Sequence, residues 1–134
     1  MITLTDIIIR LLVATLFSGI LGFERKLAKK PAGLRTNILV GVGSTLLMII
    51  SIDMAGKYGN FNDAGRIAAQ IVTGIGFLGA GAIIQSRGEV HGLTTAATIW
   101  AVAAIGMAVG MGNIIAAAIV TVLVIIVELV LRNE

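Results

Sequence analysis

The chain has 134 residues, of which 57% are hydrophobic and only 13% are charged. Soluble domains carry about a quarter charged residues, and disordered chains combine low hydrophobicity with many charges, so the composition excludes both classes. There is no Cys and a single His, which excludes a disulfide framework, a zinc–thiolate site and a multi-histidine metal site within one subunit. The composition therefore predicts a chain that lies almost entirely in a membrane.

Charged residues divide the chain into five apolar segments, each close to the roughly 20 residues that a helix needs to cross a bilayer. Because backbone groups in lipid must find their hydrogen bonds within the segment, we predict an all-α fold. The expected architecture is a polytopic membrane bundle of about five transmembrane helices in a single domain, 1–134. The start of the chain has no early Lys or Arg, so we expect the first span to be retained rather than cleaved as a signal peptide. The expected spans cover residues 7–23, 34–52, 66–85, 93–110 and 114–131.

Lys and Arg are distributed unevenly among the connections. Seven fall on the side of the first connection, the third connection and the C-terminus, and three fall on the other side. The positive-inside rule then predicts an outside N-terminus and a cytoplasmic C-terminus. Five of the seven lie in residues 24–35, where they would contact anionic lipid. The net charge of +3 therefore indicates a lipid bilayer as partner and no nucleic acid.

Two spans carry polar stripes at helical spacing, which should face protein or water rather than lipid. Two interpretations stay open: hydrogen bonding between helices, or the lining of a path for a solute or ion. In the second span the stripe consists of Asn37, Gly41, Ser44, Met48 and Ser51, and in the third it consists of Arg66, Gln70, Thr73, Phe77, Ala80 and Ile84.

Glycines are concentrated in the third span, at Gly74, Gly76, Gly79 and Gly81. The first three match a dinucleotide-binding fingerprint, but that fingerprint follows a strand and opens a helix, whereas this one lies inside an apolar span. We expect these glycines to serve close helix packing or a local helix break. Gly106 and Gly110 in the fourth span form a second close-packing pattern.

Four ordered motifs, with Trp100, carry a resemblance to a known family: residues 21–25 (LGFER), 32–36 (AGLRT), 74–84 (GIGFLGAGAII) and 92–97 (GLTTAA). They resemble the motifs of the MgtC/SapB family. The resemblance implies a bacterial inner-membrane protein associated with magnesium homeostasis, with transport of Mg²⁺ or another solute as one interpretation. The alternative that it implies is a non-transporting regulatory protein that binds another membrane protein, such as the membrane sector of the ATP synthase. Many members add a cytoplasmic C-terminal domain, whose functions we do not expect here because the sequence stops at Glu134.

The residue types limit the available chemistry. With one His and no Cys, no nucleophile and base can be paired, so we expect no enzyme and no cofactor. Mg²⁺ prefers octahedral oxygen ligands, and every acidic residue lies near the end of a span. Mg²⁺ is therefore expected at most as substrate or signal, with no carboxylate site at the midplane.

Charges at both ends of a polar stripe are costly in a bilayer unless they have partners or a role. We expect activity to depend on Glu24, Arg35 and Arg66, with Gln70 and Thr94 lining the interior. Asp53 and Asp63 are the expected acid partners for Arg66, and Glu128 and Arg132 should pair within one helix. The small-residue faces favour a homo-oligomer, with a dimer first. The full candidate set is Glu24, Arg25, Arg35, Arg66, Gln70, Thr73, Gly74, Gly76, Gly79, Gly81, Thr94 and Thr95.

Overall fold

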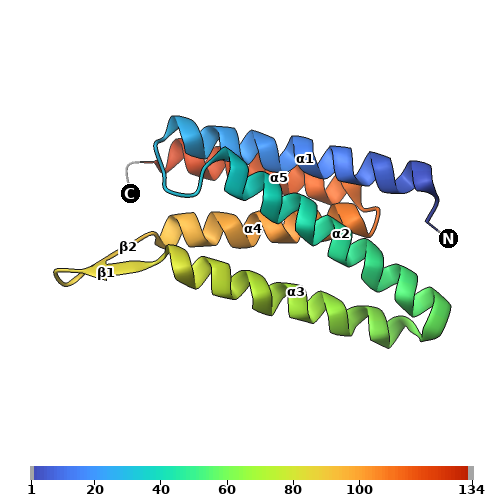
Figure 1. Ribbon diagram of the computed structural model, residues 1–134. Coiled ribbons are helices and arrows are strands. Elements are labelled where there is room, and N and C mark those ends of the chain that lie inside the picture. The colour runs from blue at the N-terminus through green and yellow to red at the C-terminus, as the bar shows by residue number, and fades with distance from the viewer. Residues whose placement is uncertain (1, 133–134) are drawn as a thin grey trace.

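The computed structural model describes residues 2–132, which form five helices and one short β-hairpin (Figure 1). The predicted all-α helix bundle is confirmed. The helices are α1 (Leu4–Leu27), α2 (Leu34–Tyr58), α3 (Phe61–Ala82), α4 (Leu93–Gly110) and α5 (Ile114–Val130), and the hairpin consists of β1 (Ile84–Ser86) and β2 (Glu89–His91).

Capping residues place the start of α3 earlier than the expected span. The Asn60 side chain accepts hydrogen bonds from the first turn, and the Asp63 side chain accepts from the backbone N–H of Asn60. This reciprocal capping box satisfies N–H groups that have no partner within the helix. Helix α3 therefore begins at Phe61 rather than near residue 66. Thr3 and Asp6 form the same arrangement at the start of α1.

The hairpin replaces the expected end of the third span. Residues 83–85 were predicted to be helical, but α3 ends at Ala82 and Ile83 adopts an extended conformation. Strands β1 and β2 then pair antiparallel and project beyond the helices (Figure 1). Gly92 follows with φ of 88°, and a Cβ there would lie 2.0 Å from the Ala82 carbonyl oxygen. Only glycine fits that return into α4.

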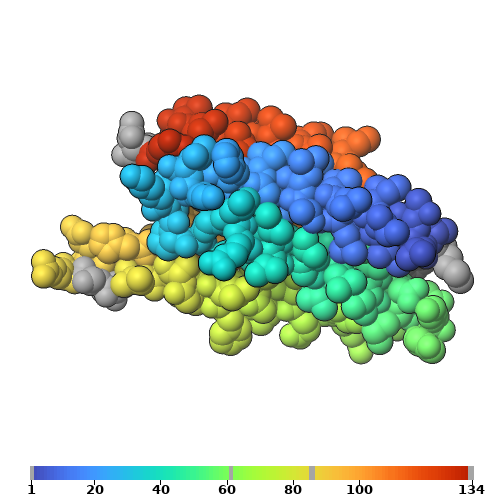
Figure 2. Space-filling model, turned by 45° about the horizontal axis from the view of Figure 1, so that its top comes forward, coloured from blue at the N-terminus to red at the C-terminus, as the bar shows by residue number. Residues whose placement is uncertain are grey.

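Helices α2 and α4 form the centre of the bundle. Helix α4 packs against all four other helices, and α2 packs against α1, α3 and α4. Helices α1 and α5 lie on one side of this pair and α3 lies on the other, so α3 forms one edge of the molecule (Figure 2). We call the end that holds the α1–α2 loop, the hairpin and the C-terminal end of α5 the basic end. The N-terminus lies at the opposite end (Figure 1).

Three helices, α1, α2 and α4, are long and apolar enough to cross a membrane. Helix α5 is apolar but has 17 residues. Helix α3 has 22 residues, long enough to cross a membrane, but its mean hydropathy is too low to identify it as a span by itself. Its Asp63, Arg66 and Gln70 side chains, together with five glycines, account for that lower hydropathy.

Candidate functional site

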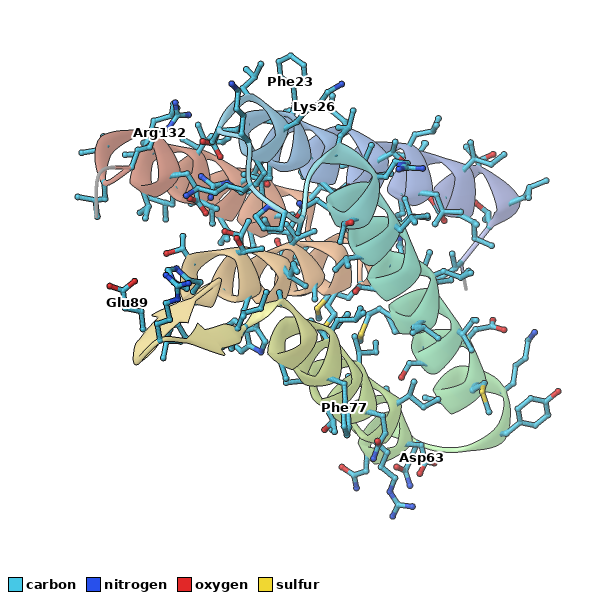
Figure 3. The ribbon with its side chains drawn as sticks, turned by 60° about the vertical axis from the view of Figure 1, so that its left-hand side comes forward. Phe23, Lys26, Asp63, Phe77, Glu89 and Arg132 are labelled. Atoms are coloured by element: carbon cyan, nitrogen blue, oxygen red, sulfur yellow. The ribbon has the colours of Figure 1, made fainter. Side chains whose placement is uncertain are left out.

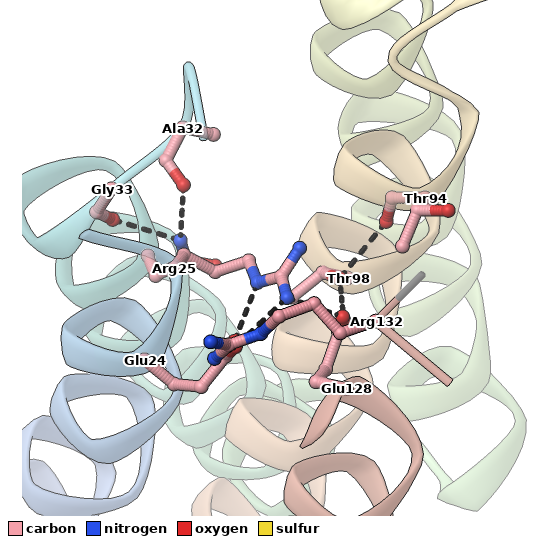
Figure 4. A network of polar contacts seen from close by, with 9 residues as sticks. Glu24, Arg25, Ala32, Gly33, Thr94, Thr98, Glu128 and Arg132 are labelled. Carbon is pink, nitrogen blue, oxygen red and sulfur yellow. Dashed lines mark hydrogen bonds and ion pairs between the residues drawn. The ribbon is translucent and has the colours of Figure 1, made fainter. Parts of the chain in front are cut away.

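Charged side chains meet inside the bundle at the basic end, between α1, α4 and α5 (Figure 4). Arg25 contacts two carboxylates: its Nε lies 2.6 Å from Glu24 Oε2, and its Nη2 lies 2.6 Å from Glu128 Oε2. Arg132 donates from Nη2 to Glu24 Oε1 at 2.7 Å. On α4, the Thr98 hydroxyl donates to Glu128 Oε1. We call these five residues the ionic cluster.

The ionic cluster is buried even though it is charged. Arg25 is 1% exposed, and Glu24 and Glu128 are each 7% exposed. Two carboxylates face two guanidiniums, so their formal charges cancel. Removing charges from water is costly, and only good pairing geometry with further hydrogen bonds offsets that cost. Arg132, with 42% of its side chain exposed, connects the cluster to the surface.

The buried face of α1 brings Arg25 into the bundle. Ala14, Ser18, Leu21 and Arg25 are all buried, and their spacing of four, three and four residues places them on one side of the helix. Arg25 also lies in the last turn of α1, where a cation is favoured by the partial negative charge of the helix C-terminus. The sequence of α1 therefore directs one guanidinium into the protein.

The expected pair of Glu128 with Arg132 is wrong. Each residue pairs instead with the end of α1, Glu128 with Arg25 and Arg132 with Glu24. The physical reason is burial: Arg25 is enclosed and needs Glu128 as a second carboxylate, whereas Arg132 is half-exposed and can reach Glu24 from outside.

Asn37 holds the loop beside the ionic cluster. Its Nδ2 donates to the carbonyl oxygens of Ala32 at 3.1 Å and Gly33 at 2.8 Å, and the side chain is fully buried. Next to it, a Cβ on Gly22 would lie 2.9 Å from the Cα of Leu34. Residues 21–25 and 32–36 therefore form one closely packed corner between α1 and α2.

The sequence model of the MgtC family matches residues 11–133. The chain belongs to the MgtC family. YhiD of Escherichia coli (strain K12) is 48% identical to the chain over 116 residues, which are 80% of the chain and 52% of YhiD. MgtC of Brucella abortus (strain 2308) is 47% identical over 119 residues, which cover 89% of the chain and 48% of that protein.

SapB of Bacillus subtilis (strain 168) is 43% identical over 112 residues, which cover 80% of the chain and 48% of SapB. The chain spans about half the length of these curated relatives. No solved structure matches it significantly. With its apolar helices, the MgtC-family chain is a membrane protein, and the resemblance drawn from its four motifs is confirmed.

In this MgtC-family structure, the residues on which we expected activity to depend lie apart. Glu24 is in the ionic cluster, and Arg35 is exposed at the start of α2. Arg66 is exposed in the first half of α3, toward the opposite end of the bundle. Neither expected partner pairs with Arg66, because Asp53 contacts Lys57 of its own helix and Asp63 caps α3.

The two polar stripes have opposite surroundings. All five members of the α2 stripe are buried in the bundle, whereas Arg66, Gln70, Thr73, Phe77 and Ala80 of the α3 stripe are exposed. The expectation that Gln70 and Thr94 line the interior is wrong for the single chain. Gln70 borders a surface groove between α2 and α3, and Thr94 borders one between α4 and α5. Thr95 is buried.

The glycines of the GIGFLGAG motif do not mediate close packing within the chain. A Cβ on Gly74, Gly76 or Gly81 would meet nothing within 4 Å, and one on Gly79 would make ordinary contact with Ala96 at 3.7 Å. Helix α3 is continuous from Phe61 to Ala82, so the expected helix break is also wrong. Three of the four glycines lie on the exposed side of α3.

Close packing is provided by the other glycine pattern. A Cβ on Gly106 would lie 2.5 Å from the Gly41 carbonyl oxygen, and one on Gly110 would lie 2.7 Å from the Met48 Cβ. Thr45 Oγ1 lies 2.9 Å from the Gly41 oxygen and 2.8 Å from the Gly106 oxygen. The predicted packing role of Gly106 and Gly110 is confirmed, with α2 as the neighbour.

Sequence reasoning missed Thr98, Glu128 and Arg132 as cluster members, and Asn37 as the residue that holds the loop. Glu128 carried a usable signal, because it is the only charged residue within Ile114–Val130. A lone carboxylate in an apolar span calls for a buried partner. Thr98 and Asn37 offered no such signal, since hydroxyl and amide groups are common on membrane helices that pack together.

Proposed function

We propose that this chain is a transmembrane domain of the bacterial inner membrane that serves magnesium homeostasis as a regulatory membrane protein, without catalysis and without carrying Mg²⁺ itself. Its relatives support the link to magnesium, since YhiD of E. coli has a provisional magnesium-transporter designation. The regulatory role would be exerted on another membrane protein. The membrane sector of the ATP synthase is one candidate for that partner.

The ionic cluster is the observation that carries this proposal. Mg²⁺ requires several oxygen ligands and retains much of its water. Both buried carboxylates, Glu24 and Glu128, are already neutralised by arginines. Within residues 2–132, no group of three acidic or histidine side chains could hold a metal ion. Buried hydroxyls such as those of Ser18 and Thr121 donate to carbonyl oxygens of their own helices, which favours packing over an ion path.

Transport is the second candidate, and one feature favours it. A groove of about 520 Å³ between α4 and α5 is bordered by Thr94, Thr98 and Glu128, so it combines two hydroxyls with one carboxylate. A cation could use these oxygens only after Glu128 had separated from Arg25. The transport candidate therefore requires the ionic cluster to open.

A flux assay separates the two candidates. We expect liposomes that contain the purified chain to take up Mg²⁺ no faster than empty liposomes, as followed with an entrapped Mg²⁺-sensitive dye. We also expect the chain to restore growth in low magnesium to a bacterial strain that lacks its own MgtC-family gene. Uptake that the chain accelerates, and that Glu128→Gln abolishes, would contradict the regulatory proposal and establish transport.

We also propose that the basic end faces the cytoplasm, because it carries most of the Lys and Arg residues. Lys30→Cys at the basic end and Tyr58→Cys at the opposite end place single thiols at exposed positions. In intact spheroplasts, a membrane-impermeant maleimide should label Tyr58→Cys and leave Lys30→Cys unlabelled until the cells are opened. The cysteine-free parent chain is the control. Labelling only of Lys30→Cys would reverse the orientation.

A further inference from the structure

The side of α3 that faces away from the bundle has the composition of an internal surface. We call Arg66, Gln70, Thr73, Phe77 and Ala80 the outer face of α3. These residues follow each other at steps of four, three, four and three, and all are exposed. Ile71, which is 5% exposed, and Ile75, which packs against the core, point the other way, whereas Val72 and Leu78, outside this face, are 42% and 54% exposed. A helix that faces lipid would have the opposite distribution.

Gln70 makes this arrangement costly in a single chain. Gln70 is the tenth of 22 residues in a helix about 33 Å long, so its side chain lies at mid-helix. It is exposed and makes no hydrogen bond within residues 2–132, unlike neighbouring Thr73, whose hydroxyl donates to Ala69. Because α3 packs against α2 and α4, which are long and apolar enough to cross a membrane, its middle lies at the depth of the hydrocarbon. An amide without a partner there costs several kcal/mol. No residue in the range 2–132 supplies that partner, so it has to come from elsewhere.

A second unpaired polar group lies in the groove that Gln70 borders. Ser44 of α2 is 2% exposed, and its hydroxyl has no hydrogen-bond partner. It lines a groove of about 590 Å³ between α2 and α3, together with Gln70 and Gly74. The groove beside the outer face is therefore lined by one polar group from α2, which is buried, and one from α3, which is exposed.

The shape of the outer face is complementary to itself. Phe77 projects from α3 and is 80% exposed (Figure 3). Gly74 and Gly81 lie one helical turn before and after it, and each has open space where a side chain would stand. The surface therefore places one large ring between two shallow depressions. The amide of Gln70 is both donor and acceptor, so it can pair with an identical amide.

We propose that a second copy of this chain covers the outer face of α3. The two α3 helices would pack parallel about a two-fold axis along the membrane normal, which brings identical residues together at the same depth. Gln70 would then bond to Gln70 of the partner subunit, and each Phe77 ring would lie over the small surface at Gly74 and Gly81. Arg66 lies toward the end of α3, where its long side chain can reach the headgroups. This interface does not depend on the proposed function.

Cysteine cross-linking tests the interface directly, because the parent chain has no Cys. Thr73→Cys and Ala80→Cys place thiols on the outer face. In native membranes, an oxidant should convert both variants into disulfide-linked dimers. Leu12→Cys, at a position 64% exposed on α1, is the control and should stay monomeric. Cross-linking of Leu12→Cys alone, or adducts of Thr73→Cys with a different membrane protein only, would overturn the proposal.

The amide pair is tested by Gln70→Leu. Side-chain hydrogen bonds between membrane helices contribute about 1–2 kcal/mol in model peptides, so the dimer dissociation constant in lipid should rise about tenfold. The fold should be retained, as seen by unchanged helicity, because Gln70 has no partner within the described chain. Val72→Leu, which changes a residue beside the outer face, is the matched control. Equal dissociation constants for the two variants would overturn the role of Gln70.

Discussion

Arg25→Leu should lower the free energy of unfolding by about 3–5 kcal/mol, the usual cost of breaking a buried ion pair by removing one partner. The loss would exceed that of the contact itself, because Glu128 would remain 7% exposed, and of the ionic cluster only the Thr98 hydroxyl would still contact it. Glu24 would keep Arg132. Unfolding of the purified chain in mixed micelles of increasing SDS fraction measures this change.

Lys26→Leu is the matched control, since Lys26 is the next residue and is exposed. It should change the unfolding free energy by less than about 0.5 kcal/mol, as surface substitutions usually do. A combined Arg25→Leu and Glu128→Leu variant should recover part of the loss, because it removes both charges from the interior. If Arg25→Leu and Lys26→Leu unfold alike, the ionic cluster does not stabilise the bundle.

The helices could be predicted from the sequence because their signal is local. Each apolar segment is long, and in lipid that length favours helix even over the β-branched run in α5. The hairpin escaped prediction because its strands have three residues each, too few to show the alternation that marks a strand. The hairpin turns at Arg87 and Gly88, where φ is positive at both residues. In the sequence, Gly88 was the local sign of that turn.

The ionic cluster could not be predicted because its partners are far apart in the chain. More than a hundred residues separate Arg25 from Glu128, whereas the spacing rule for helices pairs Glu128 with Arg132. Choosing between them requires knowing that α1 and α5 pack side by side. The polar stripes show the same limit. The stripes of α2 and α3 look alike in the sequence, but α2 is central and α3 lies at the edge of the bundle.

Gly106→Ala should lower the free energy of unfolding by about 1–3 kcal/mol, the usual cost of overpacking a well-packed interior. The added methyl would lie 2.5 Å from the Gly41 carbonyl oxygen and 3.0 Å from the Ser44 Cβ. The first of these atoms belongs to the backbone of a neighbouring helix, so it cannot move aside by a change of rotamer. Helices α2 and α4 would have to separate along the seam that forms the centre of the bundle.

Gly43→Ala is the matched control, because a Cβ at Gly43 would meet nothing within 4 Å. Alanine is favoured over glycine inside a helix by about 1 kcal/mol, so this variant should be neutral or more stable than the parent. The two changes add the same methyl to facing helices and should move the unfolding free energy in opposite directions. Equal shifts, measured by SDS unfolding, would mean that helix propensity outweighs packing here and that α2 and α4 can separate at little cost.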